Sequence, residues 1–374
     1  MPLVSVLLPT YNRNASNYLR NAIMSVLEQD MQDFELFVVD DGSQDGSNTT
    51  IAEFVRQDPR VHHIRFEKNI GLPALTCFTA FQKSVSEFIA WQFDDCVWER
   101  DLLSSLLQVA NANPSTGMVY GQAKLDLGDS TQILGEEFDL QTLLKRNIIP
   151  NCSTLTRRVV FSEVGWLDPS IVLKRICDYD MWLRISEKYD VAFLEKVVAV
   201  ENGMKLPDSL GNSVTFIPSL SERYRNQDRT SYLQISNAAN WNPFRANEWM
   251  DDDDRQQLAQ LIIEHFLRVN DCERAIAEAL VVLPKGLIQS SLDLSAFSFN
   301  VLSGLFVWYI DKLSEGSSCR ETDLRSKIRK QANFIEEQRA YIDRQHEKIL
   351  ELSSALSQSP SSGVSLKADK PGES

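Results

Sequence analysis

The sequence lacks the cysteine and histidine patterns of common metal and redox sites. Its six cysteines include no pair at CxxC spacing, and its four histidines form no HExxH cluster. A zinc enzyme or a disulfide-stapled secreted fold is therefore not expected. Scattered single cysteines are typical of a reduced intracellular protein. We expect a cytoplasmic location, with the inner face of the membrane as a peripheral alternative.

Basic residues are outnumbered by acidic residues, and the net charge at pH 7 is −14. Domains that bind nucleic acids usually present a basic face, so we expect no nucleic-acid partner. A nucleotide ligand is not excluded, because a diphosphate needs only local positive charge.

The glycine loops that usually hold nucleotide phosphates are missing. No GxGxxG follows the first predicted strand, and no GxxxxGK[ST] occurs anywhere. These absences argue against Rossmann dehydrogenases and P-loop NTPases. A nucleotide bound by this chain would depend on a metal ion instead.

Long apolar runs are scarce as well. The first residues carry no basic segment followed by a long apolar stretch, so we expect no signal peptide. The best membrane candidate is residues 294–310, a segment that is short for a span and contains Ser, Asn and Gly. We favour a buried helix there.

The first 120 residues do show a regular alternation of strand and helix patterns. Short apolar runs predict strands, and between them apolar residues recur at helical spacing. This alternation predicts an α/β fold with a doubly wound, mainly parallel sheet. The predicted strands are 4–8, 35–39, 61–66, 87–93 and 118–122, and the predicted helices are 17–28, 47–56, 73–85 and 99–112.

The remaining chain predicts three parts beyond a first domain at residues 1–215. Residues 216–320 are mainly helical in pattern. Residues 321–357 predict a coiled coil, which makes a homo-oligomer through residues 324–356 the expected assembly. The last residues, 358–374, are rich in Ser, Pro, Gly and Lys and predict disorder. The heptad rows are Ile328, Ile335, Ile342, Ile349 and Leu356, and Leu324, Gln331, Gln338, Gln345 and Leu352.

Polar residues stand at the ends of three predicted strands. The first strand ends in Thr10-Tyr11, the second in Asp40-Asp41 and the fourth in Asp94-Asp95. The carboxyl ends of parallel strands share one edge, where ligands bind. Two acid pairs there predict Mg²⁺ or Mn²⁺ completed by a phosphate, or acceptors for base N–H and ribose hydroxyl groups. For Asp40-Asp41, a turn with a helix cap is the alternative.

Six separated segments resemble glycosyltransferase family 2, in order and in spacing, over roughly residues 3–200. The resemblance implies a GT-A fold, with an α/β half that binds a nucleotide sugar and a second half that binds the acceptor. It also implies a divalent cation, Mn²⁺ or Mg²⁺, and inversion at the anomeric carbon. The segments are VSVLLPTYNR, AIMSVLEQ, FELFVVDDGSQDGS, RVHHIRFEKNIGLPAL, EFIAWQFDDCVW and CDYDMWLRI.

The same resemblance implies roles for single residues on the donor side. Thr10 and Tyr11 would line the base pocket, with the Tyr11 ring against the base. Asp41 would accept a hydrogen bond from the base, which the imide N–H of uracil or thymine allows, so UDP- or dTDP-sugars are favoured. Asp94 and Asp95 would hold the ribose and the metal, and either could be the direct metal ligand.

On the acceptor side, the resemblance implies that Asp178 is the general base, with a helix N-cap as its alternative role. Asp180 and Arg184, four residues apart on a predicted helix, are expected to form an ion pair. Two positions depart from the family pattern. Gln92 replaces the first acid of an Asp-x-Asp-Asp motif, and Cys177 replaces a glutamate beside the base.

Together these features predict an inverting, metal-dependent glycosyltransferase. It would move a sugar from a nucleotide-diphosphate donor to a hydroxyl of a glycan or lipid-linked acceptor, in cell-surface polysaccharide or lipid-linked glycan synthesis. The alternative is a catalytically degenerate scaffold displayed by the coiled coil, which the two departures favour and the retained aspartates oppose. A sugar nucleotidyltransferase ranks last, because its glycine-rich N-terminal loop is missing.

Overall fold

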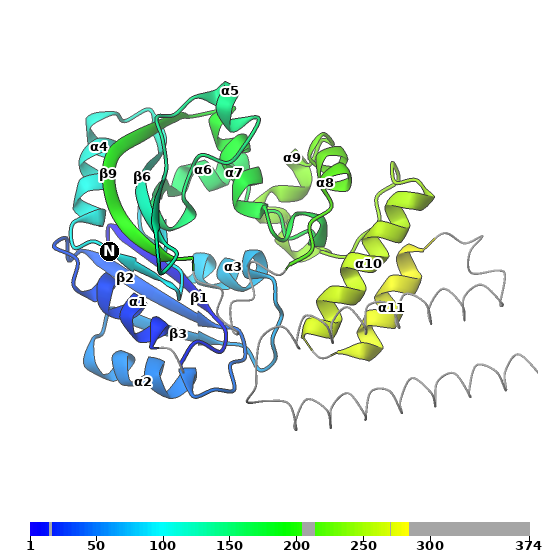
Figure 1. Ribbon diagram of the computed structural model, residues 1–374, viewed down its shortest axis with the longest axis horizontal. Coiled ribbons are helices and arrows are strands. Elements are labelled where there is room, and N and C mark those ends of the chain that lie inside the picture. Colours follow the sequence, from blue (N-terminus) through cyan, green and yellow to red (C-terminus); the bar gives the residue numbers. More distant parts are fainter. Residues whose placement is uncertain (15–16, 204–213, 270, 284–374) are drawn as a thin grey trace, which may run out of the picture. The chain divides into compact units, whose positions relative to one another are not determined.

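A mixed β-sheet with helices on both faces is the main feature of the described residues (Figure 1). The computed structural model describes residues 1–14, 17–203, 214–269 and 271–283. These belong to one compact unit, Met1–Leu283. The predicted coiled coil, the predicted tail and the apolar segment at 294–310 lie outside the described residues. The predicted domain limits stay predictions.

The strand order across the sheet is β3-β2-β1-β4-β8-β6-β9-β5, with β7 paired to β6. The first four strands of this order are parallel, as the sequence predicts. The other half is mixed, because β8 runs antiparallel to both β4 and β6. The strands are β1 (Val4–Thr10), β2 (Phe34–Asp40), β3 (Val61–Arg65), β4 (Phe88–Trp91), β5 (Cys96–Trp98), β6 (Thr116–Asp126), β7 (Thr131–Leu134), β8 (Thr154–Arg157) and β9 (Asp190–Asn202).

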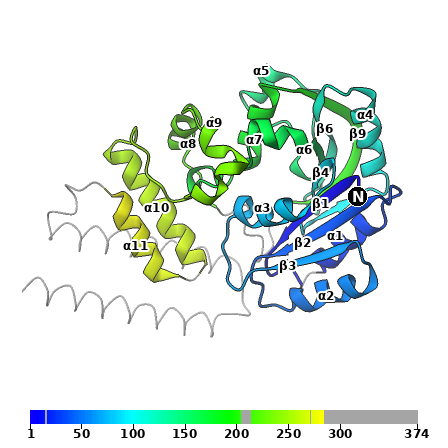
Figure 2. The same cartoon turned by 180° about the vertical axis from the view of Figure 1, so that it is seen from behind.

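Helices cover the two faces of the sheet in separate groups. Helices α1, α2 and α4 pack on one face, and α3, α6 and α7 on the other (Figures 1 and 2). The α-helices of the described residues are α1 (Tyr18–Leu27), α2 (Ser47–Gln57), α3 (Pro73–Lys83), α4 (Leu102–Ala112), α5 (Leu140–Leu143), α6 (Arg158–Val164), α7 (Cys177–Ser186), α8 (Pro218–Arg225), α9 (Thr230–Leu233), α10 (Asp252–Arg268) and α11 (Cys272–Val282).

Strand β1 shows why its sequence is continuously apolar. Val4, Val6 and Leu8 pack toward α1, α2 and α4, whereas Leu7 packs toward α3. Successive side chains of a strand point to opposite faces, so a strand covered on both sides needs apolar residues at every position. The polar residues of β1 are therefore pushed to its end, where Thr10 begins the candidate site.

The extension after the sheet is helical where it is described. Asp251 accepts a hydrogen bond from the backbone N–H of Asp254, at 2.8 Å, and three aspartates occupy the first turn of α10. Negative side chains suit the positive end of a helix dipole. Among the described residues, no helix has the length and apolar character needed to cross a membrane.

Candidate active site

The ends of β1, β2 and β4 bring the predicted donor residues together. The backbone N–H of Asp41 donates to the carbonyl of Thr10 at 3.0 Å. The N–H of Tyr11 points to a carboxylate oxygen of Asp94 at 3.4 Å. The parallel pairing of the three strands therefore places Thr10, Tyr11, Asp41 and Asp94 at one edge, as the sequence predicts.

Asp94 and Asp95 share one cation, the guanidinium of Arg13. Its Nε lies 3.3 Å from Asp94 and its Nη2 lies 3.5 Å from Asp95. Burial raises the pKa of Asp94 to about 7, although Arg13 opposes that shift and the charge of Asp95 adds to it. The pair is thus held in a partly desolvated place where added positive charge would be favourable.

This donor set suits a cation that is shared with a bound diphosphate. Among the described residues, no group of three or more His, Cys, Asp or Glu side chains is placed to hold a metal alone. Mg²⁺ is usually held by one or two carboxylates together with substrate phosphates. Asp94 and Asp95 offer those carboxylates, with Asp94 largely desolvated, so the residues present fit a divalent cation that binds with the donor.

Of the two acids that end β2, Asp40 is fully buried and structural. One of its oxygens accepts the N–H of Ser43 at 2.8 Å, and the other lies 3.7 Å from His63 and 3.8 Å from Arg65. Burial alone would raise its pKa, but the nearby His63, the hydrogen bond from Ser43 and the charge of Arg65 lower that pKa below its ordinary value. Asp40 therefore remains charged with its side chain fully buried in the fold.

Asp41 ties the loop after β3 to the edge of the sheet. Its two oxygens accept the backbone N–H groups of Ile70 and Gly71 at 2.8 and 2.7 Å. Burial raises its pKa, and these two bonds oppose the shift. Each carboxylate oxygen can accept a further hydrogen bond. Asp41 can thus hold the loop and still accept from a ligand N–H.

Helix α10 reaches this loop. The His265 ring lies close to Gly71, and its Nδ1 is 3.2 Å from the ammonium group of Lys174. Burial lowers the pKa of Lys174 to about 8 and the pKa of His265 to about 3. The histidine is therefore neutral near pH 7, and it packs a helix of the extension against the loop that Asp41 holds.

Asp178 is the second residue of α7, and the N-cap position belongs to Ile176. Its carboxylate accepts the N–H of Tyr179 at 2.8 Å. Burial raises the pKa of Asp178, and the negative charge of Asp180 adds to that shift. A raised pKa makes a carboxylate a stronger base, which suits the predicted role.

Glu201 joins the two acidic groups of the site. It lies in β9 in register with Cys96, the residue after Asp95, and Asn202 donates its N–H to the Asp95 carbonyl at 3.1 Å. Burial raises the pKa of Glu201 to about 7, with added effects from the charges of Asp95 and Asp178. The negative charges of Asp95 and Asp178 therefore both act on Glu201.

The sequence did not identify Glu201 or Arg13 as members of the site. Arg13 stands three residues after Thr10 in the first quoted segment, so its position in PTYNR was an available signal. Glu201 had no comparable signal, because its place depends on the register between β5 and β9, two strands about a hundred residues apart.

The departures from the family pattern have structural explanations. Gln92 is fully buried on the α1 side, where its Nε2 donates to Ser25 at 3.1 Å and to the Cys96 carbonyl at 3.2 Å. Its oxygen accepts the N–H of Phe93. Gln92 is therefore part of the core. Burial raises the pKa of the Cys177 thiol, so it adds no charge beside Asp178.

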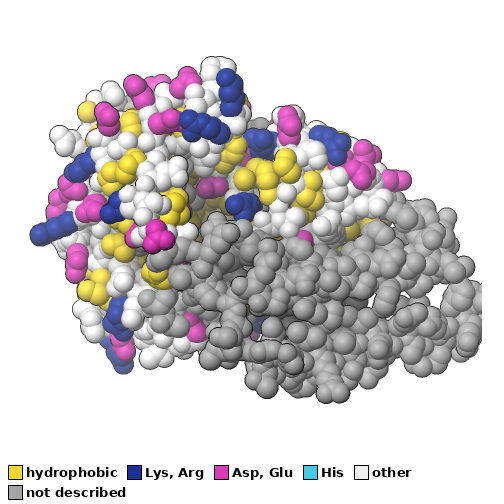
Figure 3. Space-filling model, viewed as in Figure 1, with side chains coloured by type: hydrophobic (Ala, Val, Ile, Leu, Met, Phe, Trp, Pro, Cys, Tyr) yellow, Lys and Arg dark blue, Asp and Glu magenta, His cyan; other side chains and the backbone are white. Residues whose placement is uncertain are grey.

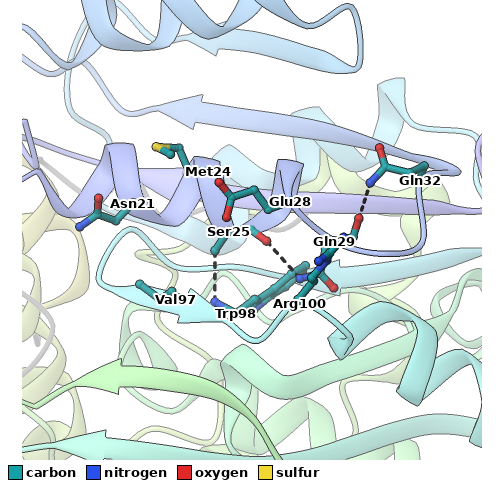
Figure 4. A pocket seen from close by; sticks show the side chains of 9 residues that line it. All are labelled: Asn21, Met24, Ser25, Glu28, Gln29, Gln32, Val97, Trp98 and Arg100. Atoms are coloured by element: carbon teal, nitrogen blue, oxygen red, sulfur yellow. Dashed lines mark hydrogen bonds between the residues drawn. The ribbon is translucent and has the colours of Figure 1, made fainter.

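The surface adds two observations. On the face shown in Figure 3, acidic and basic side chains are interspersed over the described part. A hollow between α1 and β5 is lined by none of the candidate residues (Figure 4). Its floor is closed by internal bonds, such as the one from the Trp98 N–H to the Ser25 hydroxyl at 3.1 Å.

Comparisons with known proteins agree with this arrangement. Residues 5–162 match the model of glycosyl transferase family 2. TuaG of Bacillus subtilis (strain 168), a glycosyltransferase named for a proposed part in teichuronic acid biosynthesis, is 33% identical over 107 residues, 29% of this chain and 41% of TuaG. RP339 of Rickettsia prowazekii (strain Madrid E), an uncharacterized glycosyltransferase, is 25% identical over 208 residues, 53% of this chain and 63% of RP339.

Among solved structures, the fold resembles residues 1–349 of S. aureus TarS in complex with UDP-GlcNAc. The TM-score is 0.50 at 15% sequence identity, and the match covers 84% of this chain and 89% of that chain. The chain spans less than two thirds of the curated relatives named above. The segment that carries the strand-end residues, residues 5–162, is thus similar to glycosyl transferase family 2.

Proposed function

We propose that the chain transfers a sugar from a nucleoside-diphosphate donor to a hydroxyl acceptor, with inversion at the anomeric carbon and with the help of a divalent cation. One observation carries the proposal. The acid pair at the end of β4 lies with Thr10, Tyr11 and Asp41 at one edge of the sheet, and the charges of Asp95 and Asp178 both raise the pKa of Glu201. Sugar transfer needs two groups of carboxylates close together. One binds the divalent cation that accompanies the diphosphate, and the other accepts the proton of the acceptor hydroxyl.

The donor side is assigned to the ends of β1, β2 and β4. Tyr11 would stack on the base, and Asp41 would accept from a base N–H with the lone pairs that its loop bonds leave over. This favours uracil or thymine, and the UDP-GlcNAc bound by TarS makes UDP-sugars the first donors to test. The teichuronic acid role in the name of TuaG suggests a polysaccharide acceptor.

In the proposed step, Asp178 accepts the proton of the acceptor hydroxyl while the hydroxyl oxygen bonds to the anomeric carbon. The bond from that carbon to the diphosphate breaks on the opposite face, so the configuration inverts. A cation bound at Asp94 and Asp95 would neutralise the charge that develops on the leaving diphosphate. Arg13 holds those two carboxylates in place from the protein side.

The variant Asp178→Asn tests the base. It keeps the size of the side chain but removes most of its basicity, and a positioned general base contributes about 10²–10⁴ in rate. We expect transfer to fall by that factor while donor affinity, measured by calorimetry, stays unchanged. The exposed acid Asp190 provides the control variant Asp190→Asn.

The pH profile gives a second check on the same residue. Because the base must be deprotonated and its pKa is raised, transfer should fall on the acid side at a pH above 3.8, the ordinary value for Asp. Transfer by Asp178→Asn within a few-fold of wild type would show that the base lies elsewhere. A parallel loss of donor binding would place Asp178 in the donor site or the core.

A further inference from the structure

Asp180, two residues after the proposed base, is held by an arginine of the helical extension. The guanidinium of Arg229 donates to both oxygens of Asp180, at 2.7 and 3.2 Å. The same guanidinium contacts Asp168 at 2.7 Å. Arg229 thus joins two carboxylates of the sheet-bearing part to the chain between α8 and α9, which Figure 1 shows beside α7.

Solvent hardly reaches this cluster. The side chains of Asp168, Asp180 and Arg229 are 0%, 2% and 9% exposed. Burial alone would raise the pKa of Asp180, but the charges of Arg184 and Arg229 lower it below its ordinary value. Charge-assisted bonds that water cannot replace fix the positions of their partners.

The geometry of α7 carries this constraint to Asp178. Residues two apart in a helix point about 200° apart around its axis, so Asp178 and Asp180 face opposite sides. Holding Asp180 from the extension therefore limits rotation of the first turn, and with it the direction of Asp178. The residue between them is held as well, because the Arg225 guanidinium lies 5.5 Å from the ring centroid of Tyr179.

We propose that Arg229 is a positioning residue for transfer: it sets the orientation of Asp178 through Asp180. This inference rests on the proposed function, because it assumes that Asp178 is the base. It also gives one residue of the extension a part in transfer, although the extension lies outside the segment that matches the family model.

Two variants separate positioning from folding. Arg229→Lys keeps the charge but loses the planar fork that reaches both carboxylates. The double variant Asp168→Asn/Arg229→Gln removes one charge of each sign, so Asp180 keeps Arg184 at 2.9 Å as its partner. Arg223→Lys is the matched control, because Arg223 lies in the same extension but pairs with Asp254 of α10.

The measurements are thermal melting, donor affinity by calorimetry, and kcat and KM for transfer. We expect both Arg229 variants to fold and to bind donor within about two-fold of wild type, with kcat lowered about 10- to 100-fold, as a small misplacement of a catalytic group can do. The Arg223→Lys control should keep wild-type kcat.

The outcomes distinguish this inference from the function on which it rests. If Asp178→Asn loses transfer while both Arg229 variants keep wild-type kcat, the positioning role is wrong and the proposed base stands. If Asp178→Asn keeps transfer, both the assignment of Asp178 as the base and the positioning role of Arg229 are wrong. If both Arg229 variants unfold, or lose donor affinity as much as kcat, Arg229 is a structural residue and the inference is overturned.

Discussion

At the scale of single residues, the contacts of Gln92 indicate whether the metal site at the end of β4 has lost a ligand. The pattern of glycosyltransferase family 2 has an acid at this position. Compared with that pattern, glutamine at position 92 would mean the loss of a metal ligand. In this structure its Nε2 donates to Ser25 and to the Cys96 carbonyl, on the face of the sheet that α1 covers. The side chain therefore contributes to stability rather than to metal binding.

The isosteric variant Gln92→Glu tests this assignment. It would place an oxygen where the buried amide now donates to a carbonyl, leaving acceptors facing one another without a proton. We expect the free energy of unfolding to fall by roughly 2–3 kcal/mol, with no gain in Mn²⁺ affinity, by denaturant titration and calorimetry. Tighter Mn²⁺ binding with unchanged stability would instead make position 92 a weakened metal ligand.

Lys174 gives a pH-dependent prediction. Its pKa falls from 10.5 to about 8 in the fold, because burial disfavours its charge. Between these values the unfolded chain binds more protons than the folded chain, so stability at this site is highest above pH 10.5 and is lost as pH falls to 8. We expect Lys174→Met to remove this dependence, which amounts to at most about 3 kcal/mol.

The check is the difference in unfolding free energy between wild type and Lys174→Met across that pH range. The difference should favour the methionine variant near pH 8 and shrink toward pH 10.5. A constant difference would mean that Lys174 keeps its ordinary pKa in the fold.

At the scale of elements, the sequence predicted what depends on local pattern. The strands that became β1, β2, β3, β4 and β6, and the four helices between them, lie where apolar spacing placed them. The predicted ion pair of Asp180 and Arg184 is confirmed at 2.9 Å. The strand-end residues meet because parallel strands share an edge, which the alternation already implied.

What the sequence could not predict depends on pairing between distant segments. Strand β8 has four residues and too short a pattern to reveal that it enters the sheet between β4 and β6. The approach of Glu201 to Asp95 and the hydrogen bonds of Arg229 to Asp180 also depend on pairing between distant segments. Both contacts depend on how distant segments of the chain pack together. The order of the elements along the sequence does not determine that packing.

At the scale of the whole molecule, the heptad rows at residues 321–357 predict self-association. A single amphipathic helix of this length is marginal in water, so it needs a partner. We expect the full chain to form a parallel dimer or trimer, and a variant lacking residues 321–374 to be monomeric, folded and able to bind donor. Light scattering of both forms decides this, and a monomeric full-length chain would contradict it.

The most direct test of metal-dependent sugar transfer at the end of β4 is nucleotide release from UDP- and dTDP-sugars, with and without Mn²⁺, by wild type and by the double variant Asp94→Asn/Asp95→Asn. Both substitutions are isosteric, so Arg13 keeps neighbours of the same size. We predict release that requires Mn²⁺ in wild type and falls to background in the double variant. Release at the wild-type rate by the double variant with a chelator present, or no release from any donor by wild type, would contradict it.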